Sequence, residues 1–411
     1  MPSTAQPGSS SETIHRDNLS AVLREIHLTG PRSRSELVAL TGLNRSTVAG
    51  IVAELAEHGL AYEERGDSLG APGRPSPLVH AAADGALVLA VGLAVHSLSV
   101  AIVGLGGVIH ERARIDRAHE RLSLDQTLDD LIALGRPLLE RATRTERIVG
   151  IGVAAVGPVR SRDGFVHFAP NLGWSAVPLA ETVAATFALD VPVAVRNEAD
   201  LGARAEHLRG AGMGIDDLLY LSCEVGVGGG VIVGGRPLVG NEGYAGVVGH
   251  VTVDPDGWPC GCGSRGCWET EVGERAVLRN AGRDPEGGPG EVEAVLRAAE
   301  NGDARASLDR VARWLGIGLA GLVNMLDPRL VVLGGWFGRM APLIMDGVRH
   351  ELDSRALALT RAPVRVVPGR LGADAPLVGA AERALEPLLA DPLRYAPSLL
   401  RRRKGAAVID R

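Results

Sequence analysis

The chain has 411 residues, which is too long for one ordinary hydrophobic core and predicts two or three domains. Its 49 acidic and 43 basic residues give a net charge of −6, which argues against bulk affinity for nucleic acid but leaves room for a local basic face. It has no apolar run of about eighteen residues, so no membrane span or membrane partner is expected. We expect a cytoplasmic protein with a disordered N-terminus over residues 1–11 and a basic tail over residues 393–411.

Residues 12–80 are predicted to form a winged helix-turn-helix domain. Apolar residues at helical spacing indicate three short helices. Ser33 and Glu36 fit a capping box at the start of the second helix, and Gly42 fits a left-handed stop at its end. Asn44 is suited to cap the third helix. Two helices joined by such a tight turn are typical of a helix-turn-helix, whose second helix reads the major groove.

The predicted DNA contacts lie on and around this third helix. Its exposed first turn carries polar side chains that can bond base edges or phosphates, and a wing strand and turn are expected over residues 61–67. The glycine- and proline-rich segment at residues 70–77 resembles the core of an AT-hook, which inserts an arginine into the minor groove. A three-helix interaction module that never touches DNA is the alternative. The candidate DNA-binding residues are Arg34, Asn44, Arg45, Ser46, Thr47 and Arg74.

From about residue 86 the pattern changes to alternating strands and helices. Two successive blocks, each a set of strands followed by a helix, predict a duplicated α/β body, and residues 226–230 are expected to form a glycine loop in the second block. Long helices are expected at residues 124–141 and 304–325. Strands are expected at residues 87–91, 98–103, 108–115, 148–154, 191–195, 218–222, 231–233 and 330–333.

The segment from Gly249 to Glu269 carries a candidate metal site. Three of the chain's four cysteines lie in it with the spacing C-x-C-x4-C, and a histidine stands just upstream. Three thiolates and one imidazole are the ligand set of a closed, four-coordinate zinc site, which is normally structural because no position stays open for water. The predicted ligands of one structural Zn²⁺ are His250, Cys260, Cys262 and Cys267.

The same segment resembles the signature of the ROK family of repressors, uncharacterised reading frames and sugar kinases. The resemblance is carried by C-G-C-G-S-R-G-C-W-E together with His250, and it extends over roughly residues 86–392. The head is similar to the winged head of the family's repressor branch. Further matching stretches are A-P-N-L-G-W, R-N-E-A-D, V-G-V-G-G-G and L-D-P-R-L-V-V-L-G-G, at residues 169–174, 196–200, 225–230 and 326–335.

The resemblance implies an actin-like, ribonuclease-H-like body of two lobes with a sugar cleft between them. The first lobe would comprise about residues 86–196 and a C-terminal helix at about residues 376–392. The second lobe would comprise about residues 197–375. Together with the winged helix-turn-helix head, this is the expected α/β architecture of the whole chain.

Three features that the family's kinases need are altered in this chain. The first phosphate loop reads V-G-L-A-V-H at residues 91–96 and lacks the Asp, the paired glycines and the hydroxyl that hold ATP and magnesium. The catalytic Asp is replaced by Glu198, and a shift of about one ångström in a reacting group can cost about a hundredfold in rate. Glu224 and Val225 replace a Gly-Thr pair, which puts an acid beside the phosphates. We therefore expect no enzymatic activity.

The sugar side of the resemblance is better preserved. In the family, the Asn of the Asn-Asp element, the His of the Gly-His pair and the Glu after the last cysteine contact sugar hydroxyls. Val247 stands where the family usually has a Glu, so a charge-assisted partner worth about 1.5–3 kcal/mol is missing. Asn171 fits the same cleft or, equally well, a loop cap. The candidate ligand-binding residues are Asn171, Asn197, Glu198, His250 and Glu269.

These patterns predict a sugar-responsive, DNA-binding transcriptional repressor of carbohydrate metabolism genes. Its expected partners are a double-stranded DNA operator, a sugar or sugar-phosphate effector, and further copies of itself in a homodimer or homotetramer. One alternative is a sugar kinase that phosphorylates hexoses with ATP and carries an attached DNA-binding head. Another is a DNA-binding protein whose cleft has lost its ligand and which responds to a partner protein.

Overall fold

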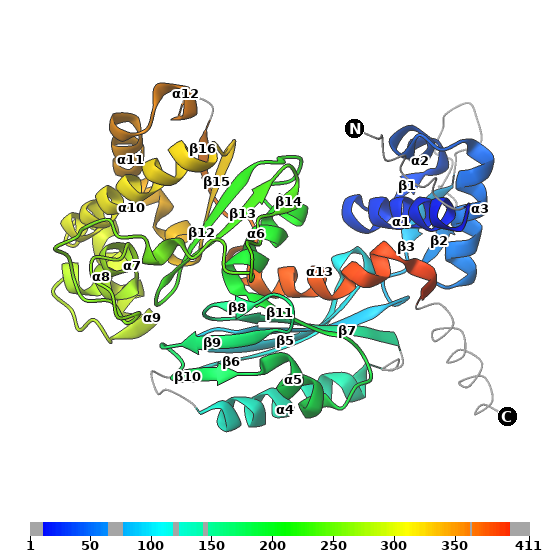
Figure 1. Cartoon of the computed structure of the whole chain (residues 1–411), viewed down its shortest axis with the longest axis horizontal. Helices are drawn as coiled ribbons and strands as arrows, with labels where there is room; N and C mark the ends of the chain where they lie inside the picture. The colour runs from blue at the N-terminus through cyan, green and yellow to red at the C-terminus, as the bar shows by residue number, and fades with distance from the viewer. Residues whose placement is uncertain (1–10, 65–76, 118–122, 143–146, 362–363, 395–411) are drawn as a thin grey trace, which may run out of the picture.

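The computed structural model describes residues 11–64, 77–117, 123–142, 147–361 and 364–394. The chain folds into a small N-terminal head and a body of two α/β lobes (Figure 1). The head lies at one end of the molecule beside the first lobe, and the second lobe lies away from the head. Helix α13 (Ala375–Ala390) runs from the middle of the body to the head, so the last described helix of the chain meets its first.

Three helices and a three-stranded antiparallel sheet form the head. The apolar stripes expected from the sequence meet in one core, in which Leu19, Leu23, Val48 and Leu55 are fully buried. The sheet has the order β1-β3-β2. The elements are α1 (Ser11–Thr29), β1 (Arg32–Ser33), α2 (Arg34–Thr41), α3 (Arg45–Glu57), β2 (Ala61–Glu64) and β3 (Leu78–Ala81).

The predicted helix caps of the head are confirmed. The Ser33 hydroxyl accepts the Glu36 N–H at 3.2 Å, and the Glu36 carboxylate accepts the Ser33 N–H at 2.7 Å. Gly42 takes the left-handed conformation, with φ of 70°, directly after α2. The Asn44 side chain accepts the Thr47 N–H at 2.9 Å at the start of α3. The turn between α2 and α3 therefore follows from local sequence chemistry.

Some sequence predictions for the two ends of the chain and for the wing reach beyond the described residues. Helix α1 already includes Ser11, so the prediction of disorder is wrong for that residue, and residues 1–10 lie outside the described part. Strands β2 and β3 pair as the two strands of a hairpin. The segment between them, residues 65–76, contains the predicted turn and Arg74 and lies outside the described residues, as do residues 395–411 of the predicted basic tail.

The first lobe is built on a five-stranded sheet with the order β11-β7-β4-β5-β6. Strands β4, β5 and β6 are antiparallel, and β7 and β11 continue the sheet in parallel. A short sheet, β10-β9-β8, extends the lobe towards the cleft. The strands are β4 (Leu87–Leu93), β5 (Ser97–Gly104), β6 (Ile109–Asp116), β7 (Ile148–Ala155), β8 (Val159–Arg160), β9 (Phe165–Ala169), β10 (Trp174–Val177) and β11 (Val193–Asn197).

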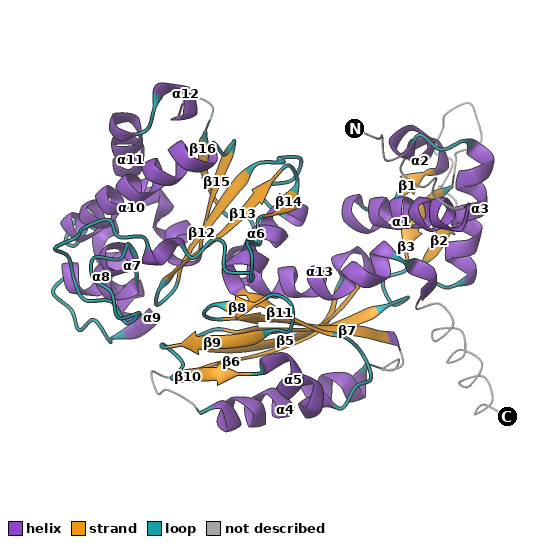
Figure 2. Ribbon diagram, in the orientation of Figure 1, coloured by secondary structure: helices purple, strands orange, loops and turns teal. Residues whose placement is uncertain are grey.

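Helices cover both faces of this sheet, as Figure 2 shows. Alternate residues of β4 explain why: Leu89 and Val91 pack into one core with α4 (Leu124–Arg141) and α5 (Leu179–Phe187). Val88 and Ala90 point the other way, into a core shared with α13 and with the head. A strand that is apolar at every position is the pattern expected of a sheet buried on both faces.

The second lobe repeats this topology with the order β14-β13-β12-β15-β16. Three antiparallel strands are again followed by two parallel ones, which confirms the predicted duplicated, actin-like body. Its strands are β12 (Leu218–Cys223), β13 (Val227–Val233), β14 (Arg236–Pro237), β15 (Leu330–Gly334) and β16 (Arg365–Pro368). Its helices are α7 (Glu269–Val272), α8 (Glu274–Asn280), α9 (Gly288–Glu300), α10 (Arg305–Leu326), α11 (Gly335–Arg355) and α12 (Ala358–Arg361).

The glycine run at residues 226–230 corrects one sequence prediction. Most of it belongs to strand β13 and is not a loop. Helix α6 (Glu198–Arg209) packs directly on this strand, and a Cβ on Gly230 would lie 2.5 Å from the Ala199 carbonyl oxygen. The glycines therefore allow a helix to approach the sheet closely. Among the described residues, no helix has the length and apolar character needed to cross a membrane.

Candidate functional site

The four predicted metal ligands converge in the structure. Their ligand atoms lie within 4.8 Å of one another, and all four cysteines of the chain are free of disulfides. The sulfurs of Cys262 and Cys267 are 3.7 Å apart, and the Cys260 sulfur is 3.6 Å from His250 Nδ1. Tetrahedral zinc, with bonds of about 2.3 Å to sulfur and about 2.0–2.1 Å to nitrogen, requires separations of about 3.8 and 3.6 Å. The residues present therefore fit a four-coordinate metal such as zinc.

The backbone of this segment is shaped to bring the ligands together. Cys267 forms a bridge with Thr252, which returns the end of the segment to its beginning. Gly266 has a φ of 68°, and a Cβ at this position would lie 1.5 Å from the Asp254 carbonyl oxygen. Only glycine fits this crossing, because any other residue would push the two strands of the loop apart.

The predicted sugar-binding residues line one open cavity between the lobes. It has about 950 Å³ of space, and Asn171, Asn197, Glu198, His250 and Glu269 all contribute to its wall. A Cβ placed on Gly226 would lie 2.8 Å from a Glu269 carboxylate oxygen and 3.9 Å from Asn171 Nδ2. These residues come from both lobes, so the cavity depends on how the lobes are held together.

Asn197 also has a structural role at the cleft. Its side-chain oxygen accepts the N–H groups of Ala199 and Asp200 at 2.8 and 3.4 Å, so it caps helix α6. Its amide group donates to the Gly157 carbonyl at 3.0 Å, which connects α6 to the first lobe. One amide hydrogen stays available for a hydroxyl group in the cavity. A ligand bound to Asn197 would therefore act directly on the start of α6.

Three carboxyl groups around the cavity have raised pKa values. Burial and the charge of Glu224 raise the pKa of Glu198 to about 8. Burial raises the pKa of Asp200 to about 7 despite the opposing charge of Arg196. Burial and the charge of Glu274 raise the pKa of Glu224 to about 7, although His96 and Arg114 lower it. Protonated carboxyl groups both donate and accept hydrogen bonds, which suits sugar hydroxyls.

Asp200 and Arg275 line the same cavity, although they are absent from the sequence-based set. Asp200 could have been identified from the sequence, because it lies three residues after Asn197 and so on the same face of a helix. Arg275 Nη1 donates to Asn171 Oδ1 at 3.5 Å, and Arg275 also pairs with Glu286 at 2.7 Å. No sequence pattern near Arg275 identifies it as a residue of the cleft, because it reaches the cleft from a helix of the second lobe.

A second cavity of about 1370 Å³ adjoins the first, and Glu224 lines both of them. Ala94, Val95 and His96 of the altered phosphate loop form part of its wall. His96 Nε2 lies 3.2 Å from a Glu274 carboxylate oxygen, so an imidazole–carboxylate contact joins the lobes here. The two segments interpreted from the sequence as altered phosphate loops thus line one cavity, with Glu224 in its wall.

Of the predicted DNA-binding residues, Asn44, Arg45, Ser46 and Thr47 form the cap and first turn of α3, Arg34 begins α2, and Arg74 lies outside the described residues. Arg45 is exposed and has no ion-pair partner among the described residues. Asn44 accepts bonds from Thr47 and from the Ser46 hydroxyl, which lies 2.7 Å away. Arg34 forms two bonds, of 2.5 and 2.7 Å, with Glu63. The Arg34 guanidinium is therefore already paired with a carboxylate.

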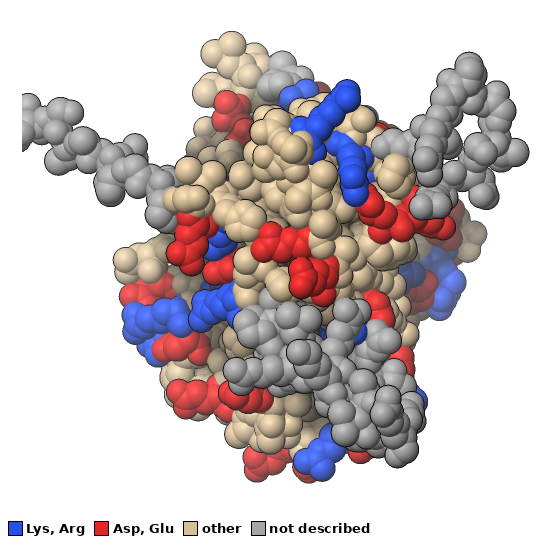
Figure 3. All heavy atoms as spheres, turned by 90° about the vertical axis from the view of Figure 1, so that its right-hand side faces the viewer, with Lys and Arg blue, Asp and Glu red and all other residues tan. Residues whose placement is uncertain are grey.

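Acidic and basic groups are interspersed over the visible face of the molecule on the side of the head (Figure 3). This agrees with the acidic net charge of the chain. Sequence-independent attraction to phosphates scales with the number of positive groups that face the duplex. The mixed surface on this face therefore does not favour broad electrostatic attraction to phosphates.

The chain resembles known proteins in both sequence and structure. It is 30% identical to the xylose repressor of Bacillus spizizenii, over 92% of this chain and 97% of that protein. It is 33% identical to a glucokinase of Streptomyces coelicolor, over 70% of this chain and 95% of the kinase.

Two solved structures are similar. A ROK family transcriptional regulator, described as a homologue of the Escherichia coli MLC protein, superposes with a TM-score of 0.74 at 25% identity and covers 95% of this chain and 99% of its own. A ROK family glucokinase from Streptomyces griseus, solved with glucose and AMPPNP, has a TM-score of 0.64 at 30% identity and covers 73% of this chain and 99% of its own. The ROK family model matches residues 88–386. The chain therefore belongs to the ROK family.

Proposed function

We propose that this chain is a sugar-responsive repressor that binds operator DNA and has no kinase activity. The observation that carries the proposal is the asymmetry of the cleft: hydroxyl-binding groups line one cavity, and the Glu224 carboxyl stands between it and the second cavity. Resemblance to a xylose repressor over 92% of the chain supports a regulator, whereas the glucokinase matches only 70% of it.

The effector that fits the cavity best is a neutral monosaccharide. Glu198, Asp200 and Glu224 disfavour a phosphate group by charge repulsion at any pH where one of them is ionised. The amide groups of Asn171 and Asn197 and the carboxylate of Glu269 supply donors and acceptors for hydroxyl groups. The exposed Val247 contributes no hydrogen bond, so selectivity rests on these other groups.

A structural zinc ion would hold the loop that presents His250 and Glu269 to the cavity. His250 Nδ1 is the ring nitrogen nearest to Cys260, which leaves Nε2 for a sugar hydroxyl. The Cys260 sulfur also lies 3.0 Å from Glu269 Oε1, so the metal loop and the start of α7 form one unit. Bound zinc would stabilise the loop without taking part in chemistry.

The DNA-binding role is assigned to α3, with Arg45 as its main contact to bases or phosphates. Asn44, Ser46 and Thr47 would contribute from the same turn, and Arg34 and Arg74 would add further contacts. A dimer would place two heads on half-sites about one helical turn apart. Arg45→Ala is expected to weaken operator binding about 10-fold or more, measured by gel shift on the DNA upstream of the gene.

A combined binding and activity experiment tests the proposal. The full chain is heated with D-xylose, D-glucose, N-acetylglucosamine or glucose 6-phosphate, and ADP release with ATP is followed in parallel by a coupled assay. We expect one neutral sugar to raise the thermal midpoint by mass action and no sugar to release ADP. Sugar-dependent ADP release that is lost in Glu198→Gln would establish the kinase alternative. No shift with any sugar, together with intact operator binding, would point to a regulator that responds to a partner protein.

A further inference from the structure

Helix α6 connects the sugar cavity to the head. At its first turn, Asn197 caps the helix and Glu198 and Asp200 line the cavity. At its last residue, the Arg209 guanidinium donates to the backbone carbonyl of His27, in helix α1 of the head, at 3.2 Å. The helix is 12 residues long, so its two ends lie about 18 Å apart. A single rigid element therefore connects the candidate effector site to the DNA-binding part.

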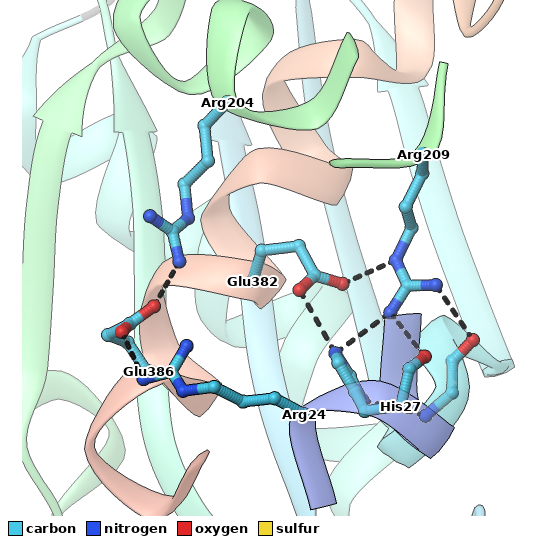
Figure 4. A network of polar contacts seen from close by, with 7 residues as sticks. Arg24, His27, Arg204, Arg209, Glu382 and Glu386 are labelled. Atoms are coloured by element: carbon cyan, nitrogen blue, oxygen red, sulfur yellow. Dashed lines mark hydrogen bonds and ion pairs between the residues drawn. The ribbon is translucent and has the colours of Figure 1, made fainter. Parts of the chain in front are cut away.

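Glu382 of α13 lies between α6 and α1 and bonds to both (Figure 4). One carboxylate oxygen accepts from Arg209 Nε at 2.5 Å, and the other lies 3.0 Å from His27 Nε2. The carboxylate is only 1% exposed and the imidazole is fully buried, so neither group can exchange its partner for water. The three helices are thus joined by one buried carboxylate.

Backbone groups orient the members of this network. The Gly106 N–H donates to His27 Nδ1 at 2.9 Å, and His27 Nε2 lies 3.0 Å from a Glu382 oxygen and 2.8 Å from Arg209 Nη2. Arg209 Nη1 donates to the Gly106 carbonyl at 3.1 Å. The turn at residues 105–107 therefore bonds to both the histidine and the arginine.

A second carboxylate repeats the arrangement further along α13. Glu386 accepts from Arg24 of the head at 2.6 Å with one oxygen and from Arg204 of α6 with the other. The Ser20 hydroxyl also donates to the Leu389 carbonyl at the end of α13, at 2.7 Å. Two α6 arginines and two head residues thus share two carboxylates, as Figure 4 shows.

The apolar surroundings make this contact rigid. Leu19, Leu23 and Ile26 of α1 belong to the same continuous core as Leu385 and Leu388 of α13. The head is therefore docked on the body by packing as well as by charge. In such a setting, removal of one partner leaves an uncompensated buried charge, so the network favours one arrangement of α6 relative to α1.

We propose that α6 couples the sugar cavity to the head through the carboxylates of Glu382 and Glu386. Displacement of the first turn of α6 moves Arg204 and Arg209, and these arginines move α1 with the attached α2 and α3. The part of this inference that concerns a sugar rests on the proposed function. The mechanical connection does not, because it depends only on contacts within the chain.

A double-mutant cycle measured without sugar tests the connection between α6 and the head. Hydrogen exchange of the full chain is measured for Asn197→Ala, for Arg209→Ala and for the double variant. Loss of the α6 cap is expected to accelerate exchange in α1 about fivefold in the otherwise native chain. In the Arg209→Ala background it should accelerate exchange in α1 by a smaller factor, because one of the two links is already broken. The proposal would be overturned if Asn197→Ala accelerated exchange in α1 by the same factor with and without Arg209→Ala, or if it left exchange in α1 unchanged.

Two further variants keep this cycle informative. If Arg209→Ala fails to fold, Glu386→Gln removes one charge at a side chain that is 26% exposed and takes its place in the cycle. Arg355→Ala is the matched control, because it breaks an arginine–glutamate pair of 2.6 Å within the second lobe. The control should leave the response of α1 to Asn197→Ala unchanged, and a loss of that response would also contradict the proposal.

A second experiment extends the test to the sugar response. Operator affinity is measured with and without D-xylose or D-glucose, whichever shifts the thermal midpoint, at saturation. We expect Arg209→Ala and Glu386→Gln to bind this sugar with native affinity while the sugar-induced change in operator affinity falls to less than twofold. A full native response in both variants would refute the coupling. If neither sugar binds the native chain, the proposed function fails, and the exchange cycle still decides whether α6 is connected to the head.

Discussion

The two cavities of the body occupy one cleft but differ in chemistry. The first is lined by amide, imidazole and carboxyl groups, and the second by an altered phosphate loop that adds Ala94 and His96, whereas Val95 of this loop lines both. Both cavities depend on the duplicated sheets, and Glu224 borders each of them. The comparison teaches that one cleft of a duplicated fold can hold two cavities whose walls differ in chemistry.

The largest effect is expected at the proposed metal site beside the first cavity. Cys267→Ser removes a fully buried member of the proposed ligand set and should lower the thermal midpoint by more than about 10 °C and abolish sugar binding. Plasma emission spectrometry measures the metal content, and calorimetry measures the thermal midpoint and the sugar binding. Ser264→Ala in the same loop is the control and should retain the metal. A Cys267→Ser chain that still binds sugar would show that the first cavity does not depend on the metal loop.

The next effect concerns the hydrogen bonds of the first cavity. Asn197→Ala should weaken sugar binding by about 10-fold or more, because it removes an amide donor and loosens the start of α6. Val95→Ala, a change at the wall of both cavities that removes no hydrogen bond, should alter sugar affinity less than about threefold. Titration calorimetry measures the sugar affinity of both variants. Equal losses of affinity would contradict the assignment of sugar binding to the polar groups of the first cavity.

A smaller effect is expected at the second cavity. The native chain should bind AMPPNP weakly, and Glu224→Gln should strengthen this binding by up to about 10-fold, because one negative charge near the phosphates is removed. No ADP release should follow, since the phosphate loop still lacks the paired glycines and the Asp. Glu286→Gln, in an exposed ion pair, serves as the control. Tight nucleotide binding by the native chain would contradict the proposed difference between the two cavities.

The smallest effect concerns the pH dependence of stability. The pKa of Glu198 rises from 4.5 to about 8 on folding, so its neutral form favours folding at low pH. This contribution is complete below pH 4.5 and is lost as the pH rises through about 8. Glu198→Gln should therefore raise the thermal midpoint at pH 8 by a few degrees and leave it nearly unchanged at pH 4.5. Equal midpoints for variant and native chain at pH 8 would contradict the raised pKa.

Local chemistry made much of the fold readable from the sequence. Ser33, Gly42 and Asn44 carry cap signals that depend only on near neighbours, and the predicted helices α2 and α3 are confirmed. The C-x-C-x4-C motif and the upstream His250 likewise specify a cluster whose members are close in sequence, and the structure brings their ligand atoms together. The five predicted sugar-binding residues also line one cavity, although their contacts with a sugar stay a prediction.

What the sequence did not reveal depends on distant packing. The glycines at residues 226–230 suggest a loop, and only the approach of α6 shows why a strand requires them. The pairing of Arg34 with Glu63 is invisible without the sheet that brings them together. The contacts of Glu382 with His27 and Arg209 join three helices that are far apart in the chain, and no local pattern predicts them.

The docking of α1 on α13 also has a consequence for biosynthesis. Ser20 and its partner Leu389 are 369 residues apart, so α1 is synthesised long before the helix α13 that receives it. During translation of both lobes, α1 therefore lacks the carboxylates and leucines of α13 that later hold it. The head consequently completes its docking on the body only after α13 has been synthesised.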